Sequence, residues 1–195
     1  MPRPKKFTVD ELLDAARDAI AEHGRAVTLA QIAEQAGAPM GSIYHRFASR
    51  EELLGRLWLR SIGRFHEVIL AMSDTVASPH DALVEMAVGV STYSRSHPSE
   101  ALAMTLFRQN ILATTGPKTL RDEAAHINDA FFARLASLTQ ARYGRCDEAL
   151  LALVGSAVIE LSYGLVRPHV GQPIPQRLDP IIRQATSAVL DLPDL

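Results

Sequence analysis

The stretch Val27–Leu54, "VTLAQIAEQAGAPMGSIYHRFASREELL", decides the fold because it holds two short helical segments separated by glycine and proline. The hydroxyl of Thr28 is placed to cap a first helix that ends at Gly37. A second short helix is expected over about Pro39–Phe47. Gly37 suits the positive φ that a tight turn between two helices needs, so the stretch predicts a helix-turn-helix.

The start of the second helix has little side-chain bulk. The backbone of Gly41 can approach another surface closely, and the free amides of a helix N-terminus attract anions. Ile43 and Phe47, four residues apart, form the inner face that holds the helix. The other side chains predict contacts with phosphates or with the DNA major groove: Met40, Ser42, Tyr44, His45 and Arg46. The alternative is an ordinary helical corner with a solvated polar face.

Basic residues flank this segment. Arg3, Lys5 and Lys6 form a basic arm before the first helix, and Arg50 follows the helix-turn-helix. The formal net charge of the chain is −2, so an anionic partner has to be met by such a local patch. The acidic residues of the N-terminal region gather instead on the outer face of the first expected helix. This distribution of charge favours a nucleic acid at the helix-turn-helix.

The rest of the chain also shows helical spacing of its apolar residues and no strand alternation. One helix is expected from its cap at Thr8 to Gly24, and another from Ser49 to Met72. Later helices are expected at Asp81–Ser96, Ser99–Ala113, Pro117–Tyr143, Asp147–Val166 and Pro175–Leu190.

The predicted fold is therefore all-α, with about nine helices. A three-helix helix-turn-helix head and a connecting helix precede a larger helical body. The predicted domains are residues 1–65, with the helix-turn-helix at 28–47, and residues 66–195, which would bind a ligand and form a dimer.

Composition narrows the class of protein. The chain has 195 residues, 47% of them apolar, and a single cysteine, Cys146, which excludes an internal disulfide and suits a reducing cytosol. The N-terminus, "MPRPKKF", has no apolar segment of a signal peptide behind it. The most apolar run, Ala149–Ile159, is cut by Glu160 and is expected to be too short to span a bilayer. These features predict a cytoplasmic protein with no membrane partner.

The segment Val27–Leu54 resembles the DNA-binding head of the TetR family of bacterial transcriptional regulators. The marks of the resemblance are the pair Ile32-Ala33, the turn glycine Gly37, the run Gly41–Tyr44, Phe47, and a basic residue followed by acids and leucine. The resemblance implies a homodimer that binds palindromic double-stranded operator DNA. It also implies a repressor whose helical body binds a small, largely apolar effector that releases the DNA.

The resemblance further implies roles for single residues. Thr28, Tyr44 and Arg50 would contact phosphates, and Met40, Gly41, Ser42 and His45 would line the groove. The chain departs from the family pattern where Pro39 stands for a serine cap, Met40 for a polar or basic residue, Arg46 for a histidine or aromatic, and Arg50 for a lysine. These departures bear on the operator sequence, because Met40 makes no bidentate pairing with a purine. The predicted DNA-binding residues are Arg3, Lys5, Lys6, Thr28, Pro39, Met40, Gly41, Ser42, Tyr44, His45, Arg46 and Arg50.

The sequence of the predicted helical body says less about function than that of the head. As an implication of the resemblance, some of its aromatic, methionine and polar residues should line an effector pocket: Trp58, Phe65, Met86, Tyr93, Met104, Phe107, Asn110, His126, Phe131 and Tyr163. The alternative for each apolar one is core packing. The last two helices are apolar around much of their surface and predict a dimer contact at Leu151, Val154, Gly155, Ala157, Val158, Ile181, Ile182, Ala185 and Val189. The alternative is that they only close the core of the monomer.

No enzyme motif is present in the sequence. Its seven histidines include no pair at the i, i+4 spacing of a helical metal site, and no glycine-rich phosphate loop follows a strand. We therefore expect no catalytic residue, no metal and no cofactor, and Cys146 as an inert thiol rather than a redox sensor. A small all-helical enzyme, or a helical interaction adaptor without DNA binding, is the alternative function.

Overall fold

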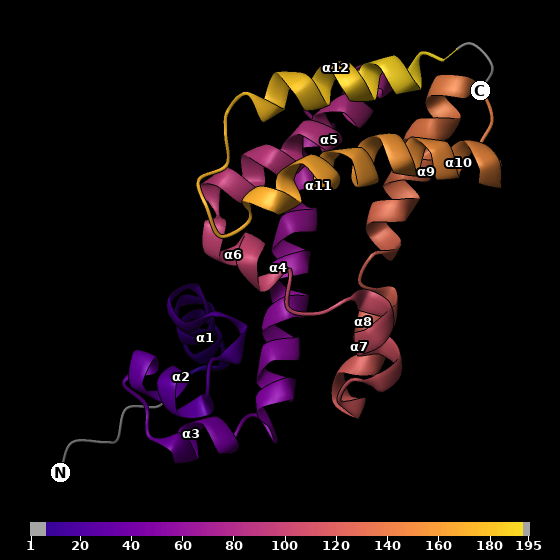
Figure 1. The fold of residues 1–195 in the computed structure, drawn as a ribbon. Helices are drawn as coiled ribbons and strands as arrows, with labels where there is room; N and C mark the ends of the chain where they lie inside the picture. The colour runs from indigo at the N-terminus through magenta and orange to yellow at the C-terminus, as the bar shows by residue number, and fades with distance from the viewer. Residues whose placement is uncertain (1–6, 193–195) are drawn as a thin grey trace. The chain divides into compact units, whose positions relative to one another are not determined.

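The computed structural model describes residues 7–192, and all regular structure within that range is helical, which confirms the all-α prediction (Figure 1). The described residues form two compact units, called here unit 1 and unit 2. Unit 1 comprises residues 7–62 and 99–127, and unit 2 comprises residues 63–98 and 128–192. The predicted domains at 1–65 and 66–195 follow chain order, whereas each compact unit is built from two separate stretches of chain.

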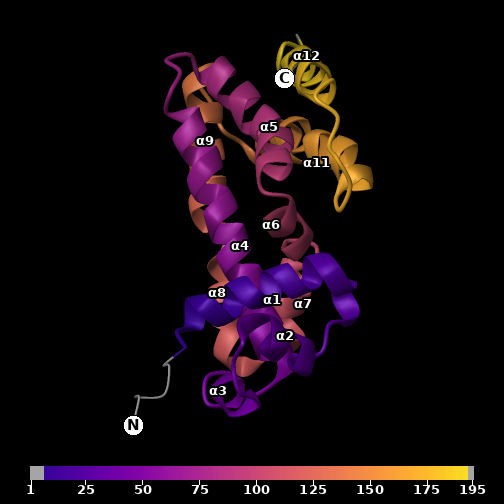
Figure 2. The same cartoon turned by 90° about the vertical axis from the view of Figure 1, so that its left-hand side faces the viewer.

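Unit 1 contains the N-terminal helices and a second set from the middle of the chain. These are α1 (Val9–His23), the 3-10 turn η1 (Gly24–Ala26), α2 (Leu29–Ala36), α3 (Met40–Tyr44), the first half of α4 (Arg50–Ser73), most of α6 (Pro98–Ala103), α7 (Gln109–Thr115), η2 (Lys118–Leu120) and α8 (Arg121–His126). Figure 2 shows α1 crossing the N-terminal half of α4, where Arg60 donates to the Asp14 carboxylate at 2.9 Å.

Local sequence sets where the first helices begin. Thr8 caps α1 and Thr28 caps α2, and each is part of a reciprocal capping box, with Glu11 and Gln31 respectively. The cap at Thr8 confirms the start that its sequence pattern predicts. At the start of α4 the Ser49 hydroxyl accepts from the Glu52 amide at 3.0 Å.

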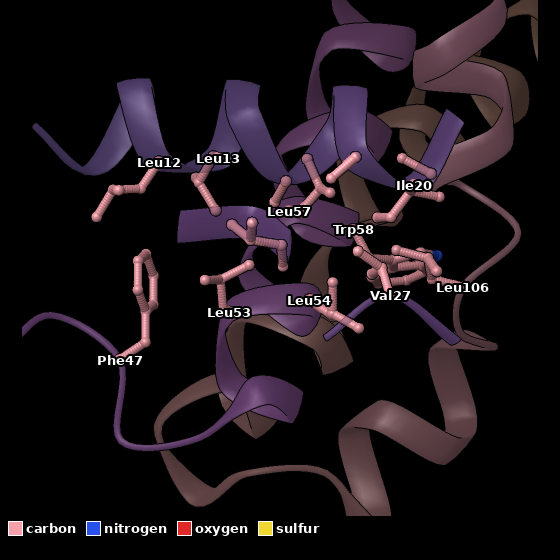
Figure 3. Packing of buried hydrophobic residues seen from close by; sticks show 14 of the residues in the cluster. Leu12, Leu13, Ile20, Val27, Phe47, Leu53, Leu54, Leu57, Trp58 and Leu106 are labelled. Carbon is pink, nitrogen blue, oxygen red and sulfur yellow. The ribbon is translucent and has the colours of Figure 1, made fainter. Parts of the chain in front are cut away.

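The core of unit 1 lies between α1, α2 and α4 (Figure 3). Trp58 is 3% exposed, and its indole N–H donates to the Met104 carbonyl at 2.9 Å. Because the indole is buried and its one donor is satisfied, Trp58 is a core residue of this unit. The other labelled side chains of Figure 3 belong to the same cluster: Leu12, Leu13, Ile20, Val27, Phe47, Leu53, Leu54, Leu57 and Leu106.

Unit 2 contains α5 (Pro79–Ser96) and most of the C-terminal helices. Its helical elements are the second half of α4, α5, α9 (Asp129–Tyr143), α10 (Glu148–Gly155), the π-helical turn η3 (Ser156–Glu160), α11 (Leu161–Val166), η4 (Arg167–His169) and α12 (Leu178–Leu190). Figure 1 shows α12 beside α5. Their shared core includes Ile69, Leu83, Met86, Leu135, Val154 and Ile182.

Two predicted helices are broken in the structure. The helix expected at Ser99–Ala113 is interrupted between Ala103 and Gln109, because Arg108 has an extended backbone (φ −104, ψ 138) and Leu106 turns into the core of unit 1. The helix expected at Pro117–Tyr143 is interrupted between α8 and α9. Ile127 there packs on the core of unit 1, while Phe131 belongs to the core of unit 2. Both breaks follow from long-range burial rather than from local helix breakers.

The prediction that the apolar run near residue 150 is too short to span a bilayer is wrong on length. Helical structure continues through Glu160, whose carboxylate accepts from the Ser156 hydroxyl at 3.0 Å. The helical segment Glu148–His169 is 22 residues long, and an 18-residue window within it has a mean hydropathy of 1.9, with 33% of that window buried. By length and composition alone it could cross a membrane, but core helices of soluble proteins share both properties.

Candidate nucleic-acid interface

The α2–α3 pair has the turn that its sequence predicts. Gly37 follows α2 with φ 59 and ψ 30, in the left-handed region, and its N–H bonds the last carbonyls of the helix. Pro39 is the N-cap of α3 rather than its first helical residue, and its missing N–H removes no hydrogen bond there. Helix α3 ends at Tyr44, three residues before the expected end at Phe47. The pair is therefore a helix, a tight turn and one short helix.

Two apolar side chains hold α3 in place. Ile43 is 0% and Phe47 4% exposed, and both lie in the core cluster of unit 1. Met40 is half-buried and packs against the same cluster. Arg46 is also half-buried, and its Nη1 donates to the Ser42 carbonyl at 3.0 Å, so it closes the end of its own short helix. Met40 and Arg46 thus have contacts within the chain that the sequence pattern does not show.

Five of the other predicted DNA-binding residues face solvent, and Ser42 is half-buried. Tyr44 is 57% exposed, and Pro39, Gly41, His45 and Thr28 are exposed. A Cβ built on Gly41 meets no atom of the chain within 4 Å, so the backbone of α3 is open on its outer side. An approaching surface can therefore come close to the α3 backbone. Arg3, Lys5 and Lys6 lie outside the described residues.

Arg50 is placed differently from the other candidates. Its Nε donates to the Val27 carbonyl at 2.6 Å, and its Nη2 donates to the Arg25 carbonyl. Both carbonyls belong to the segment that leads into α2. The prediction that Arg50 contacts a phosphate stays a prediction, but two of its three nitrogens already bind the backbone of unit 1.

The acidic side chains of α1 are matched by arginines within unit 1. Arg17 contacts Asp14 at 3.1 Å and Asp18 at 2.9 Å, and Arg60 contacts Asp14 at 2.9 Å. Burial lowers the pKa of Arg17, but hydrogen bonds to Asp18 and Glu100 and the nearby carboxylates outweigh it and leave the pKa raised. The acidic face of α1 is therefore partly neutralised.

The start of α4 is fixed by a carboxylate. Glu52 accepts from the Thr119 hydroxyl at 2.6 Å and from the Ala48 amide at 2.7 Å. The Thr119 hydroxyl first, and then the Ala48 amide, hold the pKa of Glu52 below its ordinary value of 4.5. The carboxylate therefore stays ionised near neutral pH and anchors the beginning of α4 to η2.

The predicted effector residues divide between the two units. Trp58, Met104, Phe107, Asn110 and His126 lie in unit 1, whereas Phe65, Met86, Tyr93, Phe131 and Tyr163 lie in unit 2. Met86 is 0% exposed and belongs to the core of unit 2, as Trp58 belongs to that of unit 1. Asn110 and His126 are exposed at their helix surfaces. The use of these residues by a ligand remains a proposal.

An aromatic group in unit 2 includes three of these residues. The rings of Phe65 and Tyr93 meet edge to face with centroids 5.3 Å apart. His66 lies 5.1 Å from the ring of Phe131. Phe65 and His66 are half-buried on α4, so the group has an accessible edge. Such a surface suits apolar or flat ligand groups.

The predicted dimer residues also divide by burial. Val154, Ala157, Val158 and Ile182 are at most 1% exposed and fill the core of unit 2. Their side chains therefore cover the core of their own chain. Ile181 is 46% exposed, and the other candidates are half-buried: Leu151, Gly155, Ala185 and Val189. A partner would meet Ile181 and the half-buried set.

Arg25 is a residue that the sequence analysis missed. Its Nη2 donates to the Leu106 carbonyl at 2.5 Å, across 81 positions of sequence. An arginine in a three-residue 3-10 turn carries no periodic signal, so only the tertiary structure reveals this contact.

Comparisons with known proteins agree with this geometry. Residues 12–57 match the family model described as "Bacterial regulatory proteins, tetR family". The HTH-type transcriptional repressor KstR2 of Mycobacterium tuberculosis is 39% identical over 80 residues, which cover 37% of this chain and 37% of that relative. The chain thus spans little more than a third of the length of these first relatives. The HTH-type transcriptional regulator BetI of Brucella abortus is 28% identical over 170 residues, which cover 84% of each chain.

Solved structures share the fold over nearly the whole chain. FadR from Bacillus subtilis, in complex with stearoyl-CoA, has a TM-score of 0.68 at 18% identity, and the match covers 94% of this chain and 98% of that one. FadR from Bacillus halodurans has a TM-score of 0.70 at 18% identity, with 96% and 97% covered. At these identities the likeness shows the fold alone. The matched family and the named relatives are transcriptional regulators.

Proposed function

The chain belongs, through its N-terminal domain, to the TetR family of bacterial regulatory proteins, and we propose that it represses transcription by binding a palindromic operator as a homodimer. A small, largely apolar effector bound in the body releases the DNA. The protein acts in the cytoplasm, where the operator and the effector are both present. Binding DNA as a regulator is common to the matched family and its relatives; the dimer, the palindrome and the effector are parts of the proposal.

One observation carries the proposal for DNA. Helix α3 is anchored by Ile43 and Phe47, while its other side presents an open backbone at Gly41 and an exposed phenol at Tyr44. A short, rigid helix with donors around an uncrowded tip fits the major groove. In this arrangement the Thr28 and Tyr44 hydroxyls contact phosphates, and Gly41, Ser42 and His45 face base edges. The start of α3 is supported by Pro39, Met40 and Arg46. The phosphate backbone of the DNA beside the groove is contacted by Arg3, Lys5 and Lys6.

Selection from randomised DNA duplexes, followed by fluorescence anisotropy, tests the proposal. The selected sequences should be palindromic. Tyr44→Phe removes one hydrogen bond to a phosphate in each subunit and should weaken binding of all duplexes alike, by about tenfold or more. His45→Ala should instead change the preferred sequence, because it removes a side chain that faces base edges. Failure of the wild-type protein to select any sequence would exclude a specific DNA-binding function.

Two observations support the proposal that the effector is largely apolar. The aromatic group of Phe65, Tyr93 and Phe131 in unit 2 suits an apolar ligand, and FadR of similar fold is described in complex with stearoyl-CoA. Stearoyl-CoA is therefore the first probe to add to the preformed DNA complex, with coenzyme A as the matched control without an acyl chain. Coupling of this kind typically lowers DNA affinity by about 5–150-fold. Equal affinity with and without stearoyl-CoA would remove long-chain acyl thioesters from the proposal and leave the DNA-binding function standing.

A further inference from the structure

The guanidinium of Arg50 joins the two ends of the helix-turn-helix. Arg50 is the first residue of α4, just after the helix-turn-helix, and it binds the carbonyls of Arg25 and Val27, just before it. The bonded residues are 25 and 23 positions apart in sequence. The planar fork of an arginine can bind two carbonyls at once, which a single ammonium group does not reproduce in the same geometry.

The segment that Arg50 binds sets the position of α2. Gly24 begins it with φ 71, and Val27 ends it with its side chain fully buried in the core of unit 1. Thr28 follows directly as the N-cap of α2. A shift of this segment would therefore move the first turn of α2, and with it the turn at Gly37 and helix α3.

A second arginine, which belongs to this segment, also holds it in place. Arg25 donates to the Leu106 carbonyl at 2.5 Å. Val27 and Leu106 belong to the same core cluster as Trp58 (Figure 3). The lead-in to α2 is thus held by Arg50 on the start of α4 and by Arg25 on the connection between α6 and α7.

We propose that Arg50 is a positioning residue of the DNA reader: it fixes the separation of the two ends of the helix-turn-helix through the Arg25 and Val27 carbonyls, and does not serve as a phosphate ligand. The proposal rests on the DNA-binding function proposed above. It assigns this arginine a task that depends on the shape of its side chain and not only on its charge.

The salt dependence of DNA binding separates the two roles. A phosphate contact releases counterions, so its loss lowers the magnitude of the slope of log K against log salt by about 0.9 per contact, or about 1.8 for the two subunits of the proposed dimer, whereas loss of a positioning contact leaves the slope unchanged. Arg50→Gln and Arg50→Lys are compared with the wild-type protein by anisotropy on the selected duplex, between about 50 and 200 mM salt. We expect both variants to lose about tenfold in affinity at an unchanged slope. A normal affinity in Arg50→Lys, with a reduced slope in Arg50→Gln, would overturn the proposal.

The matched control is Arg145→Gln in unit 2. Arg145 is exposed and paired with Asp147, so the variant removes the same charge from the chain without touching the helix-turn-helix. It should keep the wild-type affinity and slope. Thermal melts of all variants confirm that each remains folded.

Hydrogen exchange tests, without DNA, the contact of Arg50 with the Arg25 and Val27 carbonyls, called here the clamp. The Val27 amide donates to the Gly24 carbonyl just before α2, and the Ile32 amide donates to the Thr28 carbonyl in the first turn of α2. In Arg50→Lys these amides should exchange at least about tenfold faster, while amides of α5 keep their wild-type rates. Unchanged exchange at Val27 and Ile32 in both Arg50 variants would overturn the clamp. If the wild-type protein binds no DNA but the Arg50 variants show the faster exchange, the proposed function is refuted and the clamp remains.

Discussion

At the scale of the residue, Asp179 links α12 to α5. Its carboxylate accepts from Arg95 at 2.6 and 3.0 Å and from the Ser91 hydroxyl at 2.6 Å. Burial raises the pKa of Asp179, but the hydrogen bonds from Arg95 and Ser91 outweigh burial, so the pKa lies below its ordinary value of 3.8. The folded state therefore favours the ionised carboxylate, and the stability that it contributes is present above pH 3.8 and lost as the pH falls through the folded pKa.

Asp179→Asn should lower the free energy of unfolding by about 1–3 kcal/mol at neutral pH, because it weakens a half-buried charged pair. The difference from the wild-type protein should shrink below pH 3.8. Urea unfolding at a series of pH values measures both effects. Asp129→Asn, in an exposed first turn, is the control and should change stability by less than about 0.5 kcal/mol. A difference between Asp179→Asn and wild type that does not depend on pH would contradict the linkage.

At the scale of the element, Gly116 ends α7. A Cβ built on it lies 2.4 Å from the Leu112 backbone oxygen, which accepts the Gly116 amide, and its own carbonyl accepts from Arg121 at 2.7 Å. Backbone atoms cannot move aside as a flexible side chain can. Gly116→Ala should therefore lower the free energy of unfolding by about 1–3 kcal/mol.

Gly63 is the matched control because it lies within helix α4 and a Cβ there meets nothing within 4 Å. Gly63→Ala should raise stability by up to about 1 kcal/mol, since alanine has the higher helix propensity. Chemical unfolding of the two variants in parallel measures the contrast. Equal or greater stability of Gly116→Ala would show that the end of α7 has more freedom than its geometry indicates.

At the scale of the whole molecule, the proposed dimer is tested by two neighbouring isoleucines of α12. Ile181 is 46% exposed and Ile182 is 0% exposed in the core of unit 2. Ile181→Glu should dissociate the dimer while leaving the fold intact, because a charge is then placed in the contact. Ile182→Glu should instead unfold unit 2, because it buries the same charge inside the chain. Sedimentation at micromolar concentration and circular dichroism report the two outcomes.

A wild-type protein that sediments as a monomer would contradict the dimer. A dimer that persists in Ile181→Glu with unchanged affinity between subunits would instead contradict a dimer contact through the exposed face of α12. Ala157→Glu would be a poor test of the predicted dimer contact. Ala157 is 1% exposed, so a charge there disturbs the core before it can affect a partner.

The local parts of the fold and of the reader could be predicted from the sequence. The capping box at Thr8, the cap at Thr28, the left-handed turn at Gly37 and the inner face formed by Ile43 and Phe47 all depend on residues no more than four positions apart. Interactions over such distances leave a fixed spacing in the sequence, and this spacing also carries the resemblance to the TetR family.

Only the tertiary structure decided the rest. It placed residues 99–127 with the N-terminal helices, broke the helix expected at Ser99–Ala113, and buried Ile182 beside an exposed Ile181. In the folded chain Arg50 also donates hydrogen bonds to two backbone carbonyls, and Arg25 donates to the Leu106 carbonyl, which lies 81 positions away in sequence. The physical reason is that such contacts depend on which surfaces meet after the chain has folded, and no spacing within one helix encodes that choice.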